Sequence, residues 1–131
     1  MAGELILIVE DNEKNLKLVR DLLQHHGYRT VEARTAEEAL AAAGAAERPD
    51  LILMDIELPG MDGFEALVHL KGNPETAGIP VSALTAFAMS EDRERCLRAG
   101  FDAYLVKPIS VAEFPGQVAE VLAGVREGTP G

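Results

Sequence analysis

Five short apolar segments recur along the chain, and each is followed by a stretch of mixed polarity. They cover residues 5–9, 28–33, 51–54, 80–84 and 103–106. The first and third segments are apolar throughout, which is typical of strands buried on both faces of a parallel sheet. Segment 28–33 alternates between polar and apolar residues, so we expect it to form a strand at the edge of the sheet.

Helical spacing marks the stretches that follow the first two segments. A first helix is predicted with Gly27 as its C-cap, because apolar residues recur before it at helical intervals. These residues are Leu16, Val19, Leu22 and Leu23. Residues 35–38 (TAEE) resemble a capping box, which predicts an alanine-rich second helix that ends near residues 47–49.

Three more helices are predicted in the second half of the chain. The third ends at the GNP sequence of residues 72–74, which breaks helices. The fourth runs from near Ser90 to Gly100 and has acidic residues in its favourable first turn. Ser110 is expected to cap the fifth. The apolar residues expected on these helices are Phe64, Leu67 and Val68 on the third, and Val111, Phe114, Val118 and Val121, buried, on the fifth.

This alternation of strands and helices predicts an α/β fold. Right-handed crossovers place helices on both faces of a parallel sheet, so we expect one doubly wound sheet of five parallel strands. The expected domain covers residues 4–123. A short polar tail, residues 124–131, follows it, and no output domain is expected.

Composition and charge limit the classes of function. The length of 131 residues suits one domain, and 22 acidic against 12 basic residues argue against a nucleic-acid-binding surface. No apolar stretch approaches the roughly 18 residues of a membrane span, and the N-terminus lacks the basic residues of a signal peptide. Cys96 is the only cysteine, which excludes a disulfide framework and a thiolate metal cluster. We therefore expect a cytoplasmic protein with no nucleic-acid or membrane partner.

Residues that can bind phosphate or metal follow four of the predicted strands. Glu10 and Asp11 follow the first strand, Asp55 the third, Thr85 the fourth and Lys107 the fifth. The carboxyl ends of parallel strands share one edge of the sheet, where open α/β folds bind ligands. Lys107 would supply a cation to phosphoryl oxygens at this edge, and Thr85 would supply a hydroxyl group.

A carboxylate that accepts a phosphoryl group needs a divalent cation, because carboxylate and phosphate repel each other. Magnesium prefers oxygen ligands and retains several waters, and manganese is a possible substitute. Asp11 and Asp55 could ligate it directly, Glu10 directly or through water, and the backbone carbonyl of Glu57 could complete the shell. Spacing alone does not decide whether Asp11 or Asp55 is the acceptor.

Five blocks of sequence resemble the receiver domain of bacterial response regulators. They are IVEDN at 8–12, LMD at 53–55, LPGMDG at 58–63, LTA at 84–86 and KP at 107–108. The resemblance implies a flavodoxin-like fold with strand order 2-1-3-4-5. It also implies a magnesium-dependent phosphoacceptor of two-component signalling rather than an enzyme. The sequences TAFAM at 85–89 and KPIS at 107–110 are similar to those of stand-alone regulators of cell division and polarity in stalked alphaproteobacteria.

The resemblance also implies individual roles. Asp55 would accept a phosphoryl group from a phosphohistidine on a sensor histidine kinase or a histidine phosphotransfer protein. Thr85 would shift toward that group, Tyr104 would rotate inward, and the Lys107–Pro108 peptide bond would be cis. An unidentified downstream protein would then bind to the altered face. The residues expected on that face are Phe87, Met89 and Tyr104.

Two features depart from the pattern of the family. Ser82 stands in the fourth strand where a bulky β-branched residue is usual, so its hydroxyl could loosen the core or bond locally. Pro115, with Gly116 after it, falls in the last helix, although a proline in a helix interior costs about 3 kcal/mol. That helix could instead begin near Phe114, after a distorted turn.

Other interpretations of the same residues stay open. Asp11 and Asn12 could simply cap the first helix. The side chains of Glu57 and Asp62 are expected to be solvated in turns, and Asp102 is expected to be a loop carboxylate. A phosphatase of the haloacid dehalogenase type also uses a strand-end aspartate, but it would want a second aspartate at position 57, where this chain has Glu57. A receiver-like scaffold that is never phosphorylated is the remaining alternative.

Overall fold

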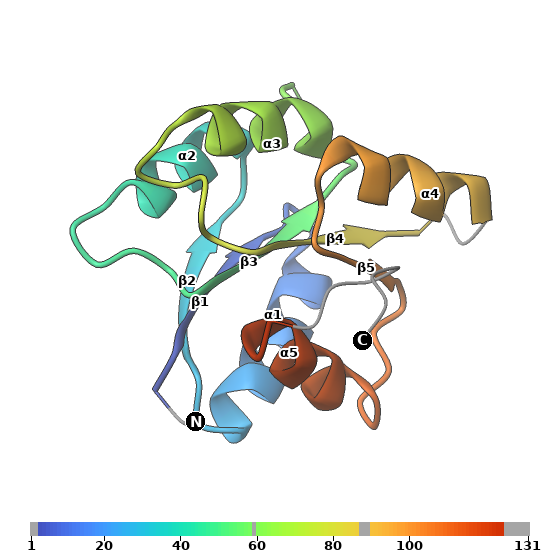
Figure 1. Ribbon diagram of the computed structural model, residues 1–131. Helices are drawn as coiled ribbons and strands as arrows, with labels where there is room; N and C mark the ends of the chain where they lie inside the picture. Colours follow the sequence, from blue (N-terminus) through green and yellow to red (C-terminus); the bar gives the residue numbers. More distant parts are fainter. Residues whose placement is uncertain (1–2, 59, 87–89, 125–131) are drawn as a thin grey trace.

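The computed structural model describes residues 3–58, 60–86 and 90–124. Within these ranges, strands and helices alternate, and five strands form one parallel sheet in the order β2-β1-β3-β4-β5 (Figure 1). The doubly wound sheet and its strand order are therefore confirmed. In chain order the elements are β1 (Leu5–Val9), α1 (Glu13–His25), β2 (Arg29–Ala33), α2 (Ala36–Ala43), β3 (Leu51–Asp55), α3 (Gly63–Gly72), β4 (Val81–Thr85), α4 (Ser90–Ala99), β5 (Ala103–Val106) and α5 (Phe114–Leu122).

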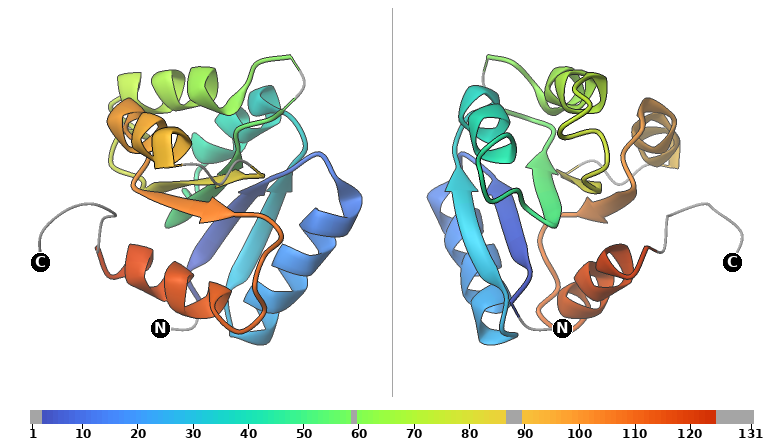
Figure 2. Two further views of the ribbon diagram at one scale, coloured as in Figure 1. Left: turned by 90° about the vertical axis from the view of Figure 1, so that its right-hand side faces the viewer. Right: turned by 60° about the vertical axis from the view of Figure 1, so that its left-hand side comes forward.

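Two layers of helices cover the sheet. Helices α2, α3 and α4 lie on one face, and α1 and α5 lie on the other (Figures 1 and 2). Alternate residues of β1 enter the two cores: Leu7 packs on the side of α2 and α3, and Ile8 packs on the side of α1 and α5. Strands β1 and β3 are buried at every position, whereas β2 is largely exposed at the edge of the sheet, as its alternating sequence predicts. No helix in the described part of the chain is long and apolar enough to span a membrane.

The ends of the first four helices follow the predicted signals, with one exception. Thr35 Oγ1 accepts a hydrogen bond from Glu38 N (3.1 Å) at the start of α2, as expected of a cap. Gly27 and Gly100 follow α1 and α4 with φ values of 90° and 115°, in the left-handed region that glycine favours. The predicted end of α2 near residues 47–49 is wrong, because the helix ends at Ala43. Residues 44–48 are all exposed, so a further turn would bury no apolar surface.

The last helix begins at Phe114, so Ser110 does not cap it directly. Ser110 instead organises a turn before the helix: its Oγ accepts from Glu113 N (3.2 Å), and its carbonyl oxygen accepts from Phe114 N (2.9 Å). Val111 lies in this turn with 61% of its surface exposed, so the prediction that it is buried is wrong. Pro115 falls in the first turn of α5, where its missing N–H costs no helical hydrogen bond.

Two aspartates stabilise the amino-terminal edge of the sheet. Asp50 Oδ2 accepts from Leu5 N at the start of β1, and Asp102 Oδ2 accepts from Val81 N at the start of β4, both at 2.8 Å. Asp102 also lies 3.5 Å from Lys71 Nζ. Asp102 is therefore a buried structural carboxylate, although the sequence indicated only a loop position.

Ser82 is fully buried in β4, and its hydroxyl has no hydrogen-bond partner among the described residues. A buried hydroxyl group without a partner destabilises a fold, because it has lost its hydrogen bonds to water. We therefore expect Ser82→Ala to raise the free energy of unfolding by about 1 kcal/mol, measured by urea denaturation. Ser110→Ala is the matched control and should lower it, because that hydroxyl accepts a backbone hydrogen bond. A loss of stability in Ser82→Ala would contradict this expectation.

Candidate functional site

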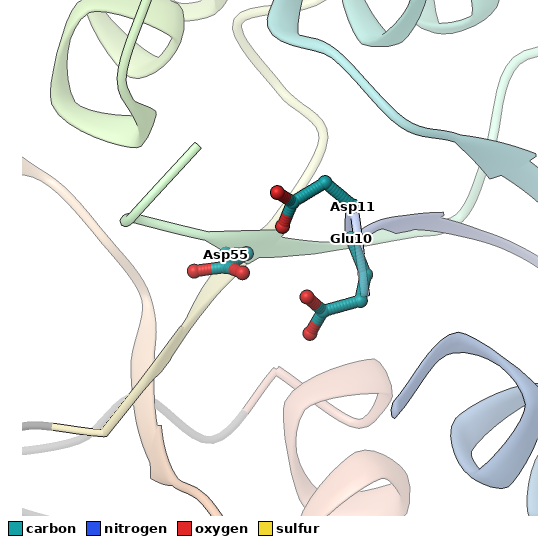
Figure 3. Close-up of side chains that lie close together, drawn as sticks. All are labelled: Glu10, Asp11 and Asp55. Carbon is teal, nitrogen blue, oxygen red and sulfur yellow. The ribbon is translucent and has the colours of Figure 1, made fainter. Parts of the chain in front are cut away.

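The carboxyl ends of β1, β3 and β5 bring three charged side chains into direct contact. Lys107 Nζ lies 2.9 Å from Glu10 Oε1 and 2.9 Å from Asp55 Oδ2. Glu10 and Asp55 are almost completely buried, whereas Asp11 is exposed. Figure 3 shows the carboxylates of Glu10, Asp11 and Asp55 gathered at the ends of β1 and β3. The strand-end residues singled out in the sequence therefore lie together.

The register of the strands explains this convergence. Val9 pairs with Met54, Asp55 with Leu84, and Thr85 with Val106, so neighbouring strands end at nearly the same height. Glu10, Asp55, Thr85 and Lys107 are therefore all placed at one edge. The backbone continues this pairing beyond β5, because the N–H of Lys107 donates to the carbonyl oxygen of Thr85 (2.8 Å).

Burial and charge together set the protonation of the two central groups. Burial, together with a hydrogen bond to Asp55, raises the pKa of Glu10 to about 7, although Lys107 acts in the opposite direction. Burial alone would lower the pKa of Lys107. Its hydrogen bonds with Asp55 and Glu10 outweigh burial, so the pKa of the ammonium group is raised. Lys107 thus stays protonated at neutral pH and neutralises part of the negative charge around it.

The three carboxylates fit a divalent cation. One oxygen from each of Glu10, Asp11 and Asp55 can be chosen so that all lie within 4.8 Å of one another. With every group ionised, three carboxylates and one ammonium group leave two negative charges, which a divalent cation would balance. An all-oxygen donor set that is open on the Asp11 side suits magnesium, which keeps several waters.

The two oxygens of Asp55 have different partners. Oδ2 contacts Lys107, whereas Oδ1 accepts a hydrogen bond from the N–H of Glu57 (2.8 Å). The backbone of Glu57 is thus next to Asp55, and the role of its carbonyl as a metal ligand stays a prediction. Thr85 is fully buried at the end of β4, and the Lys107–Pro108 peptide bond is cis.

The structure separates the two open interpretations of residues 11 and 12. Asn12 is the N-cap of α1, because its side chain accepts from Lys14 N and Asn15 N. Asp11 instead belongs to the carboxylate cluster. Of the residues predicted on the partner-binding face, Tyr104 is buried among the core residues on the α2–α3–α4 side, while Phe87 and Met89 lie outside the described residues.

One hydrogen bond at the site could not be predicted from the sequence. Glu57 was expected to be a solvated turn residue, and its side chain is exposed. Its Oε1 nevertheless accepts a hydrogen bond from the N–H of Ala86 at 3.1 Å. The two residues are 29 positions apart, and only the pairing of β3 with β4 brings them together.

The raised pKa of Glu10 predicts a pH-dependent stability for the metal-free protein. Folded Glu10 keeps its proton up to about pH 7, whereas the ordinary value is 4.5, so the folded state binds more protons between these values. The free energy of unfolding should therefore fall as the pH rises through this interval. Glu10→Gln, which is neutral at every pH, should be more stable than wild type at pH 8 by about 1–3 kcal/mol, and nearly equal to it near pH 4, below the ordinary pKa of 4.5.

Urea denaturation in EDTA at both pH values would test this prediction. Glu47→Gln is the control, because Glu47 is an exposed carboxylate remote from the site. A stability difference between Glu10→Gln and wild type that is the same at both pH values would show that Glu10 ionises normally in the folded protein.

Three comparisons with known proteins, by family, by sequence and by structure, all match this chain to receiver domains or response regulators. The family described as "Response regulator receiver domain" matches residues 6–119. The polar-differentiation response regulator DivK of Brucella anthropi is 52% identical over 109 residues, which are 83% of this chain and 88% of that protein. The receiver domain of a sensor histidine kinase from Pseudomonas aeruginosa, solved with a magnesium ion in its active-site cleft, has a TM-score of 0.82 and 37% identity. The match covers 94% of this chain and 99% of that one. The manganese-bound form of the response regulator Rcp1 has a TM-score of 0.76 and 27% identity, with 98% of both chains covered.

Proposed function

The chain belongs to the response regulator receiver domain family, and we propose that it accepts a phosphoryl group on Asp55 and signals through the change that follows. Receiver-domain response regulators are signalling proteins. The observation that carries the proposal is the partly buried contact of Asp55 with Lys107, beside Glu10 and Asp11. The donor we propose is a phosphohistidine on a sensor histidine kinase or a histidine phosphotransfer protein.

In the proposed reaction, the N–P bond of the phosphohistidine breaks and an O–P bond to the Asp55 carboxylate forms. Lys107 holds the carboxylate in place and offers a positive charge to the phosphoryl oxygens, while Thr85 supplies a hydroxyl donor. A magnesium ion held by Glu10, Asp11, Asp55 and the backbone carbonyl of Glu57 would offset the repulsion between Asp55 and the incoming phosphate. Positioning and charge neutralisation, rather than acid–base catalysis, are what these residues can provide.

The acyl phosphate would become a signal through a two-state change. It adds negative charge and strong acceptor oxygens beside Thr85, which can bias the packing of β4 and of Tyr104 on β5. A shift from a mostly inactive to a mostly active population needs a few kcal/mol of preference between the states. We propose that a downstream protein reads this change.

The two alternatives receive less support. A haloacid dehalogenase-type phosphatase would need a second carboxylic acid at position 57 as its acid–base catalyst. In this chain the Glu57 carboxylate accepts a hydrogen bond from the backbone N–H of Ala86. An unphosphorylated scaffold would have no need of a partly buried Lys107–Asp55 ion pair at the strand ends, because apolar residues would be at least as stable there.

Intact-mass spectrometry after incubation with acetyl phosphate tests the proposal. We expect a gain of one phosphoryl group with magnesium and none in EDTA, because the cluster is too negative to admit phosphate without a cation. Many turnovers of a small phosphoester without a stable adduct would instead support the phosphatase. If no adduct forms, a titration with beryllofluoride followed by amide NMR distinguishes rapid hydrolysis from an inert site. An unchanged spectrum would support the scaffold.

A further inference from the structure

The Glu57 side chain connects two loops at the mouth of the site. Its Oε1 accepts a hydrogen bond from Ala86 N (3.1 Å), and its own N–H donates to Asp55 Oδ1 (2.8 Å). One residue therefore contacts both the proposed phosphoacceptor and the backbone that follows Thr85. No step of the proposed reaction uses this side chain.

The strand register explains how the contact forms. Asp55 pairs with Leu84, so Glu57 and Ala86 each lie two residues beyond the paired positions, just after the ends of the adjacent strands β3 and β4. The carboxylate thus bridges the space between the ends of β3 and β4. Both residues are exposed, so core packing does not hold the bond in place. Its strength depends on the local charge.

We propose that Glu57 is a positioning residue that holds the Ala86 amide in the unmodified protein and releases it when Asp55 is phosphorylated. This inference rests on the proposed function. A phosphoryl group on Asp55 brings up to two negative charges next to the Glu57 backbone and repels its carboxylate. It also offers strong acceptor oxygens that compete for N–H groups at the end of β4. The Glu57–Ala86 bond therefore opposes modification, and its loss frees the start of the β4–α4 connection.

Two substitutions separate the hydrogen bond from the charge. Glu57→Ala removes both, whereas Glu57→Gln keeps an acceptor for Ala86 and removes only the charge. The backbone carbonyl of residue 57 is retained in both. Because the Glu57–Ala86 hydrogen bond is exposed to solvent, we give it the strength of an ordinary hydrogen bond, and we expect the Glu57→Ala variant to bind beryllofluoride roughly 3- to 10-fold more tightly than wild type at saturating magnesium. Glu57→Gln should lie between the two.

Glu75→Ala is the matched control. Glu75 is also an exposed glutamate in a side-chain hydrogen bond, here with Arg48, and it lies in the α3–β4 connection at the other end of the sheet. The Glu75→Ala variant loses the same charge as Glu57→Ala, but at the other end of the sheet. Its affinity for beryllofluoride should therefore stay at the wild-type value. If Glu75→Ala gained as much affinity for beryllofluoride as Glu57→Ala, the change in net charge alone would explain the gain. That result would overturn the proposal.

The amide resonance of Ala86 reports the bond directly in the unmodified protein. It should move upfield in Glu57→Ala and stay close to its wild-type position in Glu57→Gln and Glu75→Ala. An unchanged Ala86 resonance in Glu57→Ala would overturn the inference while leaving the proposed function intact. So would equal beryllofluoride affinities of Glu57→Ala and Glu57→Gln, because charge alone would then explain the gain.

Failure of the proposed function gives a different pattern. In that case no variant, nor the wild type, would bind beryllofluoride, although the Ala86 resonance would still respond to Glu57→Ala. That result would reduce the Glu57–Ala86 bond to a local structural contact and overturn the proposed release.

Discussion

Asp55→Asn is expected to abolish the gain of a phosphoryl group from acetyl phosphate while leaving the protein folded. An amide oxygen cannot form the acyl phosphate, and Lys107 loses one of the two carboxylates that it contacts. The fold should not suffer, because the substitution also removes one of three carboxylates that repel one another in the metal-free site. The effect on phosphorylation is therefore complete, and the effect on stability is small.

Intact-mass spectrometry with magnesium, together with urea denaturation, measures both effects. Asp62→Asn is the matched control. It makes the same chemical change at the N-cap of α3, where asparagine caps about as well as aspartate, so it should phosphorylate normally. If Asp55→Asn keeps the adduct and Asp11→Asn loses it, the acceptor is Asp11, the other strand-end aspartate. That outcome would refute Asp55 as the acceptor, but the protein would still be one that is phosphorylated on an aspartate.

The position of the site could be predicted from the sequence because strand ends follow from apolar runs. Strands of similar length in a parallel sheet end at the same edge, so the residues that follow them must meet. Glu10, Asp55, Thr85 and Lys107 needed no further information to be placed together. Their individual roles did need more, since spacing treats Asp11 and Asp55 alike.

Features that depend on contacts distant in sequence could not be predicted in the same way. The hydrogen bond from Ala86 to Glu57 and the one from Val81 to Asp102 both join segments more than 20 residues apart. Each satisfies a backbone N–H at an end of β4, and no local pattern distinguishes such a carboxylate from a solvated one. The exposure of Val111 has a different and local cause, because the turn at Ser110 delays the start of α5 to Phe114.

Gly63→Ala is expected to destabilise the protein by about 2–3 kcal/mol, although alanine is the better helix former. A Cβ atom at position 63 would lie 2.6 Å from Ile56 Cα and 2.9 Å from the carbonyl oxygen of Asp55. Both are backbone atoms of the chain that leaves β3, so neither can rotate away as a side chain could. Helix α3 would have to move outward and strain the hydrogen bond from Gly63 N to the carbonyl oxygen of Ile56 (3.3 Å).

Gly72→Ala, in the last turn of the same helix, is the matched control. A Cβ atom there would meet nothing within 4 Å, so this variant should keep or slightly raise the free energy of unfolding in urea. Equal stabilisation in both variants would show that α3 can move away from β3 without cost. If the clash does cost stability, the strain falls on the backbone of Asp55 and Ile56. The same variant should then also phosphorylate more slowly, because the backbone that carries Asp55 is displaced from Lys107.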